Sequence, residues 1–265
     1  MTTAAPSEPL VLRHDRDGVA TLTLNRPAQR NALSVALMGA LQAELDRIKD
    51  DRTVKVVVIA GSGPGFCGGH DLKEMRANPG RQAYEALFAQ CSRLMLSIVR
   101  LPKPVIARVH AVAAAAGCQL VASCDLAVAA ESARFAVNGV NIGLFCSTPM
   151  VALTRAIPRK PAMEMLLTGE LIDARTALAY GLVNRVAADD QLDAAVAELA
   201  AKIVAKSPYA LAIGKEAFYR QAELGLEDAY AYASQVMTTN ILARDAEAGI
   251  DAFIAKRPMP DWQGR

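Results

Sequence analysis

Aromatic side chains are scarce in this sequence, and neither sign of charge is in large excess. Phe, Tyr and Trp make up only 5% of the 265 residues, although the hydrophobic share reaches 52%. This composition suits closely packed helices and parallel strands better than an all-β sandwich, so we expect an α/β protein. The 29 basic and 27 acidic residues leave a formal charge of +2, too weak a field to attract nucleic acid or an anionic membrane. We therefore predict neither of these partners.

Cysteine pairs and long apolar runs are missing as well. The five cysteines include no CxxC pair, and their odd number in a chain of this length indicates reduced thiols. No apolar run reaches membrane-spanning length, and the N-terminal MTTAAPSEPL lacks the basic and apolar regions of a secretory signal. We therefore predict a cytoplasmic protein in which residues 1–8 form a flexible leader.

Common motifs of cofactor and metal sites are also absent. The sequence contains no P-loop, GxSxG or HExxH, and no His or Cys cluster with metal-ligand spacing. Glycines follow the apolar run VVVIAG, but Pro64 interrupts them and the strict G-x-G-x-x-G of dinucleotide sites does not occur. The sequence predicts no metal and no permanently bound cofactor.

Hydrophobic periodicity predicts alternating strands and helices over the first 160 residues. A hairpin is expected to turn at Asp17–Gly18, and Ser34 is a candidate cap for the helix that follows. The later elements are predicted to be strands over 54–63, 104–112 and 124–130, and helices from Asp71, over 81–100 and over 116–123. This alternation implies right-handed crossovers and a parallel sheet.

Helices dominate the rest of the sequence. The only strand expected after about Lys160 lies in LVNRVA, whereas Asp173 and Gly181 suit the two ends of a short helix. Further helices are predicted over 190–205, 208–221 and 226–256. This region therefore forms a helical extension of the core.

Two segments combine a strand, a run of small residues and a helix. Gly68 and Gly69 allow a turn that presents the N–H of His70, and small residues around Ala116 allow close approach to the N–H at the next helix start. Two such donors can converge on one oxygen atom. Taken singly, the segment before His70 is explained equally well by a plain strand-to-helix turn, and the segment before Ala116 is better explained by close helix–sheet packing.

Taken together, six ordered motifs identify the chain as similar to the crotonase (enoyl-CoA hydratase/isomerase) superfamily. The match runs from about Leu10 to Trp262, and GGHDLKEM with VNIGLFCSTP is similar to the branch labelled enoyl-CoA hydratase domain-containing protein. The six motifs are TLNRPAQRNALS, VVVIAGSGPGFCGGHDLKEM, KPVIARVHAVAAAAGCQL, CDLAVAAESARFAVNGVNIGL, TGELIDARTALAYGLVNRV and FIAKRPMPDW. The resemblance implies a ββα-superhelix core over 9–200, and a helical region over 201–265 that serves in oligomerisation and covers the coenzyme A site.

The resemblance also implies a substrate and a set of site residues. The substrate is an acyl-CoA thioester, so coenzyme A enters as part of the substrate, and its carbonyl oxygen accepts from the N–H groups of His70 and Ala116. Phe253 and Lys256 match a pair that reaches the nucleotide end, often from a neighbouring subunit of a homotrimer or a dimer of trimers. The remaining positions implied for binding coenzyme A are Arg26, Ala28, Gln29, Gly68, Asp71 and Leu72.

The sequence departs from the family at both acid/base positions. Relatives that hydrate 2-enoyl thioesters carry one glutamate in GCEL and another in PEV or PEI, where this chain has Gln119 and Gly139. An acid found eight positions later in some relatives is replaced by Ser147. Because each acid/base group is worth about 10²- to 10⁴-fold in rate, we expect ordinary hydration to be weak or absent.

The residues leave other groups and other functions open. Asp125 matches an architectural position, whereas the remaining candidates for chemistry are Asp71, Glu74, the His70 imidazole, His110, Cys118 and Cys146. We favour an enzyme of the hydratase/isomerase family with weak ordinary activity. The alternatives are decarboxylation of a malonyl-type thioester, which needs no base to remove a proton, and a non-catalytic acyl-CoA-binding oligomer.

Overall fold

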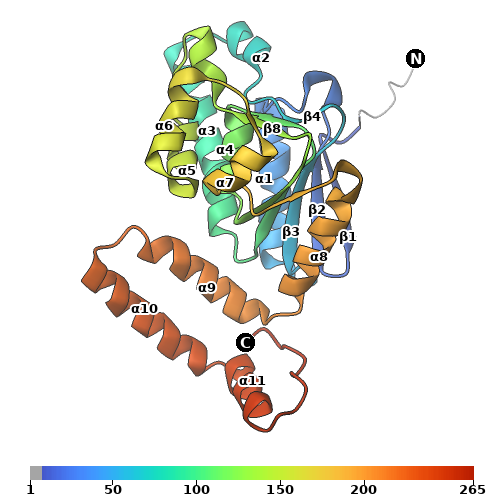
Figure 1. Cartoon of the computed structure of the whole chain (residues 1–265), viewed down its shortest axis with the longest axis vertical. Coiled ribbons are helices and arrows are strands. Elements are labelled where there is room, and N and C mark those ends of the chain that lie inside the picture. The colour runs from blue at the N-terminus through green and yellow to red at the C-terminus, as the bar shows by residue number, and fades with distance from the viewer. Residues whose placement is uncertain (1–7) are drawn as a thin grey trace.

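The computed structural model describes residues 8–265, so the leader predicted for residues 1–8 lies outside the described residues except for Glu8. Two sheets and their covering helices form the upper body of the molecule, and three C-terminal helices extend below it (Figure 1). The apolar run VVVIAG forms a central strand whose six residues are all buried, as a strand covered on both faces requires.

The larger sheet has the order β1-β2-β3-β5-β7-β10. Its strands are β1 (Val11–Arg16), β2 (Val19–Leu24), β3 (Val56–Gly61), β5 (Val105–Val109), β7 (Leu126–Ala130) and β10 (Arg185–Ala187). The hairpin between β1 and β2 turns at Asp17 and Gly18, both at positive φ, as the sequence predicts. All other pairs in this sheet are parallel, which confirms the predicted parallel arrangement.

The smaller sheet contains short strands that the sequence analysis missed. Its order is β4 (Gly65–Cys67), β6 (Val112–Ala114), β8 (Arg134–Ala136) and β9 (Ile172–Asp173). The strand predicted over 104–112 is confirmed as β5 over 105–109, but it ends earlier than predicted, because the chain leaves the larger sheet at His110 and joins the smaller one as β6. The pairs β3–β4, β5–β6 and β7–β8 each give one strand to each sheet before a helix follows, which produces the expected strand–strand–helix turns.

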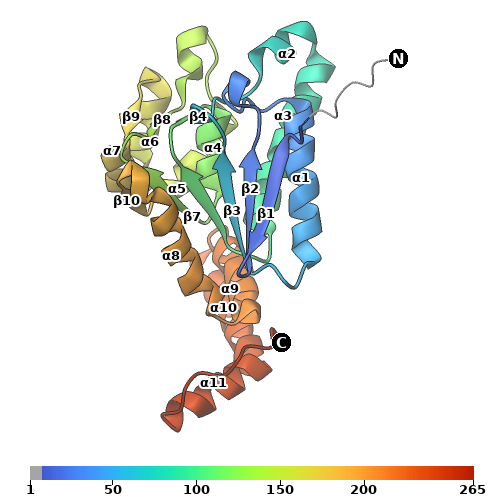
Figure 2. The same ribbon diagram turned by 90° about the vertical axis from the view of Figure 1, so that its right-hand side faces the viewer.

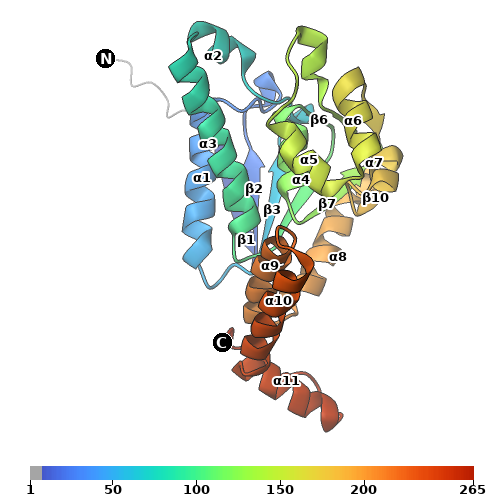
Figure 3. The same ribbon diagram turned by 90° about the vertical axis from the view of Figure 1, so that its left-hand side faces the viewer.

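Helices cover both faces of the larger sheet. The helices of the core are α1 (Val35–Asp50), α2 (Leu72–Ala77), α3 (Arg81–Arg100), α4 (Ala116–Ser123), α5 (Pro149–Ala156), α6 (Arg159–Thr168), α7 (Ala174–Tyr180) and α8 (Leu192–Val204). Helices α1 and α3 run side by side along one face (Figure 3), and their buried residues belong to the main apolar core. On the opposite face α8 packs against Val56, Ile106 and Val128 (Figure 2).

Helix ends follow the predicted capping residues. The hydroxyl of Ser34 accepts from the N–H of Leu37, and the carboxylate of Asp173 accepts from the N–H of Thr176 at 2.7 Å. Gly181 closes α7 at φ +87°, the left-handed conformation that favours glycine.

The C-terminal helices are α9 (Pro208–Gln221), α10 (Leu226–Ile241) and α11 (Arg244–Ile254). The single helix predicted over 226–256 is wrong, because the chain turns at Leu242 and Ala243. The turn buries Asp245, whose carboxylate accepts from the hydroxyl of Ser207 and from the N–H groups of Gln263 and Gly264. These bonds hold α11 to the start of α9 and to the C-terminal tail.

A buried ion pair attaches α9 to the core. The ammonium of Lys215 lies 2.6 Å from the carboxylate of Asp125 and also donates to the carbonyls of Ile98 and Lys103. The hydroxyl of Tyr219 donates to the same carboxylate at 2.9 Å. Asp125 is therefore a structural residue, as its position in the sequence implies.

Candidate functional site

The loop before α2 lies directly against the start of α4. A Cβ built on Gly69 would lie 3.0 Å from the Cβ of Ala115 and 3.4 Å from the main-chain nitrogen of Ala116. Gly69 has φ +92°, so both its conformation and its surroundings require glycine. This contact brings the two candidate N–H donors, of His70 and Ala116, into one site.

The backbone around Ala116 is held in an uncommon conformation. Ala115 has φ +49° and ψ −116°, and Ala116 is the first residue of α4. A Cβ on Gly117 would lie 2.1 Å from the carbonyl oxygen of Cys67, so the close contact between the loops leaves no room for a side chain there. Within residues 8–265, neither the N–H of His70 nor that of Ala116 donates a hydrogen bond. Two unpaired donors at neighbouring loops are suited to an oxygen that gains negative charge.

Gln119 stands one turn after Ala116 on α4, close to the candidate donors. Only 4% of its surface is exposed, and its Oε1 atom lies 3.9 Å from the thiol of Cys91 on α3. A primary amide neither takes up nor releases a proton near neutral pH. Gln119 can therefore orient a ligand but cannot transfer a proton to it.

Gly139 lies in the 3-10 helix η2 (Asn138–Ile142), and the space that a side chain would take there is already filled. A Cβ at this position would lie 2.5 Å from the carbonyl oxygen of Leu144 and 2.9 Å from the sulfur of Cys146. The N–H of Gly139 donates to that sulfur at 3.3 Å. Burial raises the pKa of the Cys146 thiol, although this N–H acts in the opposite direction. The resemblance implies a glutamate at position 139, and only the structure shows that the Leu144 carbonyl and the Cys146 sulfur lie where a side chain would begin.

The acids considered as substitutes are occupied in structural bonds. Asp71 caps α2 by accepting from the N–H of Glu74, and it pairs with Arg26 at 3.0 Å. Burial opposes ionisation of Asp71, but these bonds outweigh it and hold its pKa below the usual value. Glu74 accepts from the N–H of Val35 at 2.9 Å. Neither carboxylate is a free base.

Two further candidates lie in settings that do not favour chemistry. The Nε2 atom of His110 lies 2.9 Å from the carbonyl oxygen of Gly63, while its Nδ1 atom is buried without a hydrogen-bond partner in the described chain. Cys118 is fully buried, and burial raises the pKa of its thiol to about 12. Cys118 is therefore a packing residue.

The loop residues implied for coenzyme A lie together. The N–H of Gly68 donates to the carbonyl of Arg30 at 2.9 Å, which joins the 26–30 loop to the 68–72 loop. Ala28, Gln29 and Gly68 are exposed, and Leu72 is 48% exposed. The guanidinium of Arg26, by contrast, is 19% exposed and bonds to Asp71 and to the carbonyl of Ala32, so it supports the loop from inside.

Phe253 and Lys256 are not brought to these loops within one chain. Phe253 is 74% exposed on α11, and Lys256 follows the same helix at φ +51°. Helix α11 lies at the lower end of the molecule, whereas α2 lies at the upper end (Figure 1). Any contact of these residues with the site requires another copy of the chain.

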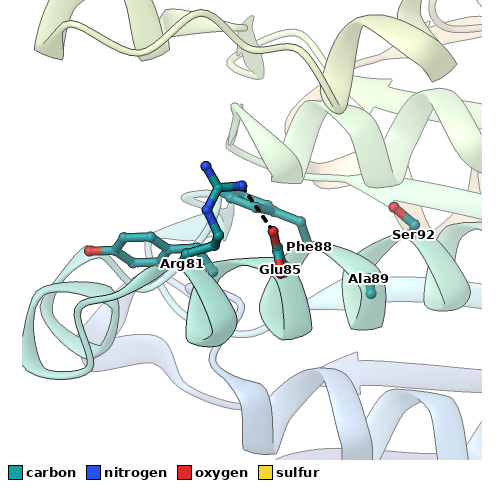
Figure 4. A pocket seen from close by; sticks show the side chains of 6 residues that line it. Arg81, Glu85, Phe88, Ala89 and Ser92 are labelled. Atoms are coloured by element: carbon teal, nitrogen blue, oxygen red, sulfur yellow. Dashed lines mark hydrogen bonds and ion pairs between the residues drawn. The ribbon is translucent and has the colours of Figure 1, made fainter.

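An open pocket of about 550 Å³ lies along α3. Arg81 and Glu85 form an ion pair at 3.2 Å on its wall (Figure 4). The ring of Phe88, which also lines the pocket, packs edge to face against the His70 imidazole with centroids 5.6 Å apart. The sequence analysis missed this wall, because an amphipathic helix gives no signal that separates a pocket-lining face from an ordinary surface.

Metal sites and membrane spans are not found in the part of the chain that the structure describes. Within residues 8–265, no three His, Cys, Asp or Glu side chains are placed to hold a metal ion. Over the same residues, no helix is long and apolar enough to cross a bilayer.

Known proteins resemble this chain over nearly its whole length. The family profile described as enoyl-CoA hydratase/isomerase matches residues 14–265. Enoyl-CoA hydratase domain-containing protein 3, mitochondrial, of Rattus norvegicus is 46% identical over 257 residues, which cover 97% of this chain and 85% of that protein. This relative is consistent with the branch that GGHDLKEM and VNIGLFCSTP indicate.

Solved structures show the same fold. The crystal structure of an enoyl-CoA hydratase from Mycobacterium smegmatis has a TM-score of 0.94 at 55% identity, covering 96% of this chain and 99% of that one. The crystal structure of human enoyl coenzyme A hydratase domain-containing protein 3 has a TM-score of 0.92 at 44% identity, covering 95% and 99%. The α/β fold with strand–strand–helix turns and C-terminal helices, predicted from the resemblance, is confirmed.

Proposed function

Because the chain belongs to the enoyl-CoA hydratase/isomerase family, we propose that it binds an acyl-CoA thioester and polarises the thioester carbonyl with the N–H groups of His70 and Ala116. The observation that supports this proposal is the close contact of Gly69 with Ala115 and Ala116, together with the absence of a hydrogen bond from either N–H within residues 8–265. In enzymes, the loss of one such donor costs about 10²- to 10³-fold in rate. Coenzyme A then enters with the substrate, along the exposed loops that include Ala28, Gln29, Gly68 and Leu72.

We further propose that ordinary hydration by this site is slow. Gln119 and Gly139 occupy the positions where related hydratases carry glutamates, and Asp71 and Glu74 are engaged elsewhere. The donors can still stabilise an enolate once it forms. A reaction that generates the enolate without a carboxylate base, such as decarboxylation of a malonyl-type thioester, is therefore the second candidate function.

The test is turnover of 2-enoyl, 3-enoyl and carboxylated coenzyme A thioesters, followed by mass spectrometry. An Ala116→Pro variant removes one donor at the first position of a helix, where proline is often accepted. The proposal is supported if the wild type hydrates or isomerises its substrate slowly and the Ala116→Pro variant does so at a lower rate. Loss of carbon dioxide from the carboxylated thioester selects the second candidate, and binding without turnover of any substrate selects a non-catalytic acyl-CoA-binding protein.

We also propose a homotrimer, or a dimer of trimers, as the assembled form. The support lies on α10 and α11, which leave Leu226, Tyr230, Leu242 and Phe253 at least 70% exposed. A neighbouring copy would cover these side chains, and would bring Phe253 and Lys256 to a site that they cannot reach within one chain. Native mass spectrometry tests this assembly, and a monomer at micromolar concentration would contradict it.

The cytoplasmic location predicted from the sequence is retained as a proposal. The rat relative is named mitochondrial, so the two locations are to be distinguished by experiment. A fluorescent fusion at the C-terminus, imaged in the native cell, distinguishes a cytoplasmic from an organellar distribution.

A further inference from the structure

The imidazole of His70 is a buried polar group without a partner. Both ring nitrogens are shielded from solvent, and neither meets the geometry of a hydrogen bond within residues 8–265, although the Leu33 backbone lies near enough to raise the pKa of the ring. Such groups are rare, because a buried donor or acceptor without a partner is destabilising, so each requires an explanation. His110, by comparison, bonds through one of its two ring nitrogens.

The position of this imidazole points to a ligand. The N–H of the same residue is one of the two candidate oxyanion donors, so the side chain lies close to any thioester bound there. On its other side the ring packs against Phe88, which lines the open pocket along α3 (Figure 4). The imidazole therefore contacts a residue of the pocket wall and belongs to the same residue as one candidate donor.

The surroundings of the His70 imidazole favour its neutral form, which can accept a proton. Burial lowers the pKa of His70, against the smaller raising effects of the Leu33 backbone and the Glu74 carboxylate, so the ring is neutral at pH 7. Among the other charged groups on the adjacent elements, Asp71 pairs with Arg26, and Arg81 pairs with Glu85 on α3. Lys73 and Arg76 of α2, and Arg93 and Arg100 of α3, add further positive charge to these helices. A neutral imidazole without a partner retains a free lone pair.

We propose that the His70 imidazole is the proton-transfer group of this site, in place of both absent glutamates. The inference rests on the proposed function and goes beyond it. The step requires that ligand binding opens the shielded ring to one water. One ring nitrogen then takes a proton from this water while the water oxygen bonds to C3 of a 2-enoyl thioester, and the C2=C3 electrons move toward the thioester carbonyl oxygen. The imidazolium then returns the proton to C2, so atoms and charge balance without a co-reactant.

The test separates the side chain from the main-chain donor. A His70→Gln variant keeps the N–H of residue 70, so binding of butyryl-CoA, measured by calorimetry, should be unchanged. Hydration of crotonyl-CoA, and exchange of the C2 protons of butyryl-CoA in deuterated water, should fall about 10²- to 10⁴-fold. His14→Gln makes the same substitution at an exposed position of β1, outside the site, and it should retain the wild-type rate.

The pH profile provides a readout that a packing role would not change. The wild-type rate should fall on the acid side, below the usual histidine pKa, as the ring becomes protonated, and this limb should be absent in His70→Gln. Full activity of His70→Gln would overturn the inference and leave the proposed function intact. Wild-type binding without either exchange or hydration would also overturn it, whereas failure to bind butyryl-CoA would instead contradict the proposed function.

Discussion

Placing a glutamate at position 139 should destabilise the protein and should not restore hydration. The clash arises at the first side-chain atom, because a Cβ would lie 2.5 Å from the carbonyl oxygen of Leu144 and 2.9 Å from the sulfur of Cys146. Overpacking of this kind typically costs about 1–3 kcal/mol. At roughly 2–4 °C per kcal/mol for a domain near this size, the melting temperature should fall by about 2–12 °C.

Matched variants identify the cause of this loss. Gly139→Ala should show most of the decrease in melting temperature, because the contacts involve the Cβ. Gly214→Ala in α9 adds the same methyl group where no atom lies within 4 Å, so it should leave stability unchanged or raise it by about 0.5–1 kcal/mol. Both are measured by calorimetric melting, and hydration of crotonyl-CoA is measured by mass spectrometry.

The contrary result for Gly139→Glu would also be informative. A Gly139→Glu protein that melts with the wild type and hydrates crotonyl-CoA at least about 10²-fold faster would refute the reasoning. The segment from Leu144 to Cys146 would then move aside at little cost, and the filled space at Gly139 would not be a barrier to catalysis.

Three further changes test the fold around the site. Ala115→Gly should leave the free energy of unfolding unchanged or raise it by up to about 2 kcal/mol in urea titrations, because it relieves the strain of φ +49°. Lys215→Met should lower it by about 3–5 kcal/mol in the same assay, since the buried carboxylate of Asp125 loses its cation. Burial opposes ionisation of Asp245, but hydrogen bonds from Ser207 and two N–H groups lower its pKa in the folded protein. The ionised carboxylate therefore contributes to stability above its unfolded pKa of about 3.9, and this contribution is lost as the pH falls through the lower folded pKa. The difference in melting temperature between wild type and Asp245→Asn should therefore shrink from pH 6 to pH 3.

Much of the fold was predictable because its signals are local. The buried run VVVIAG, the Asp17–Gly18 turn and the caps at Ser34 and Asp173 each act within a few residues. The strands of the smaller sheet contain two or three residues each, which is too few for an alternation of apolar and polar residues to be recognised in the sequence. The turn at Leu242–Ala243 depends on bonds of Asp245 to distant residues, which no local pattern reveals.

For the candidate site too, the sequence predicts some features and the structure alone reveals others. The sequence locates His70, Ala116, Gln119 and Gly139, because ordered motifs carry them. Their spatial relations are not visible in it: the contact of Gly69 with Ala115 depends on pairing between β4 and β6, and the packing of Cys146 against Gly139 depends on a loop conformation. The unpartnered state of the His70 ring likewise requires the surrounding atoms to be known.

The most direct test of the two-donor site is the infrared stretch of a ¹³C-labelled thioester carbonyl in bound butyryl-CoA. Two N–H donors polarise the C=O bond, so we predict a shift to lower wavenumber on binding and a smaller shift in Ala116→Pro, with folding of that variant checked by circular dichroism. A bound carbonyl that absorbs at the same wavenumber as in water would contradict the central claim that His70 and Ala116 polarise a thioester.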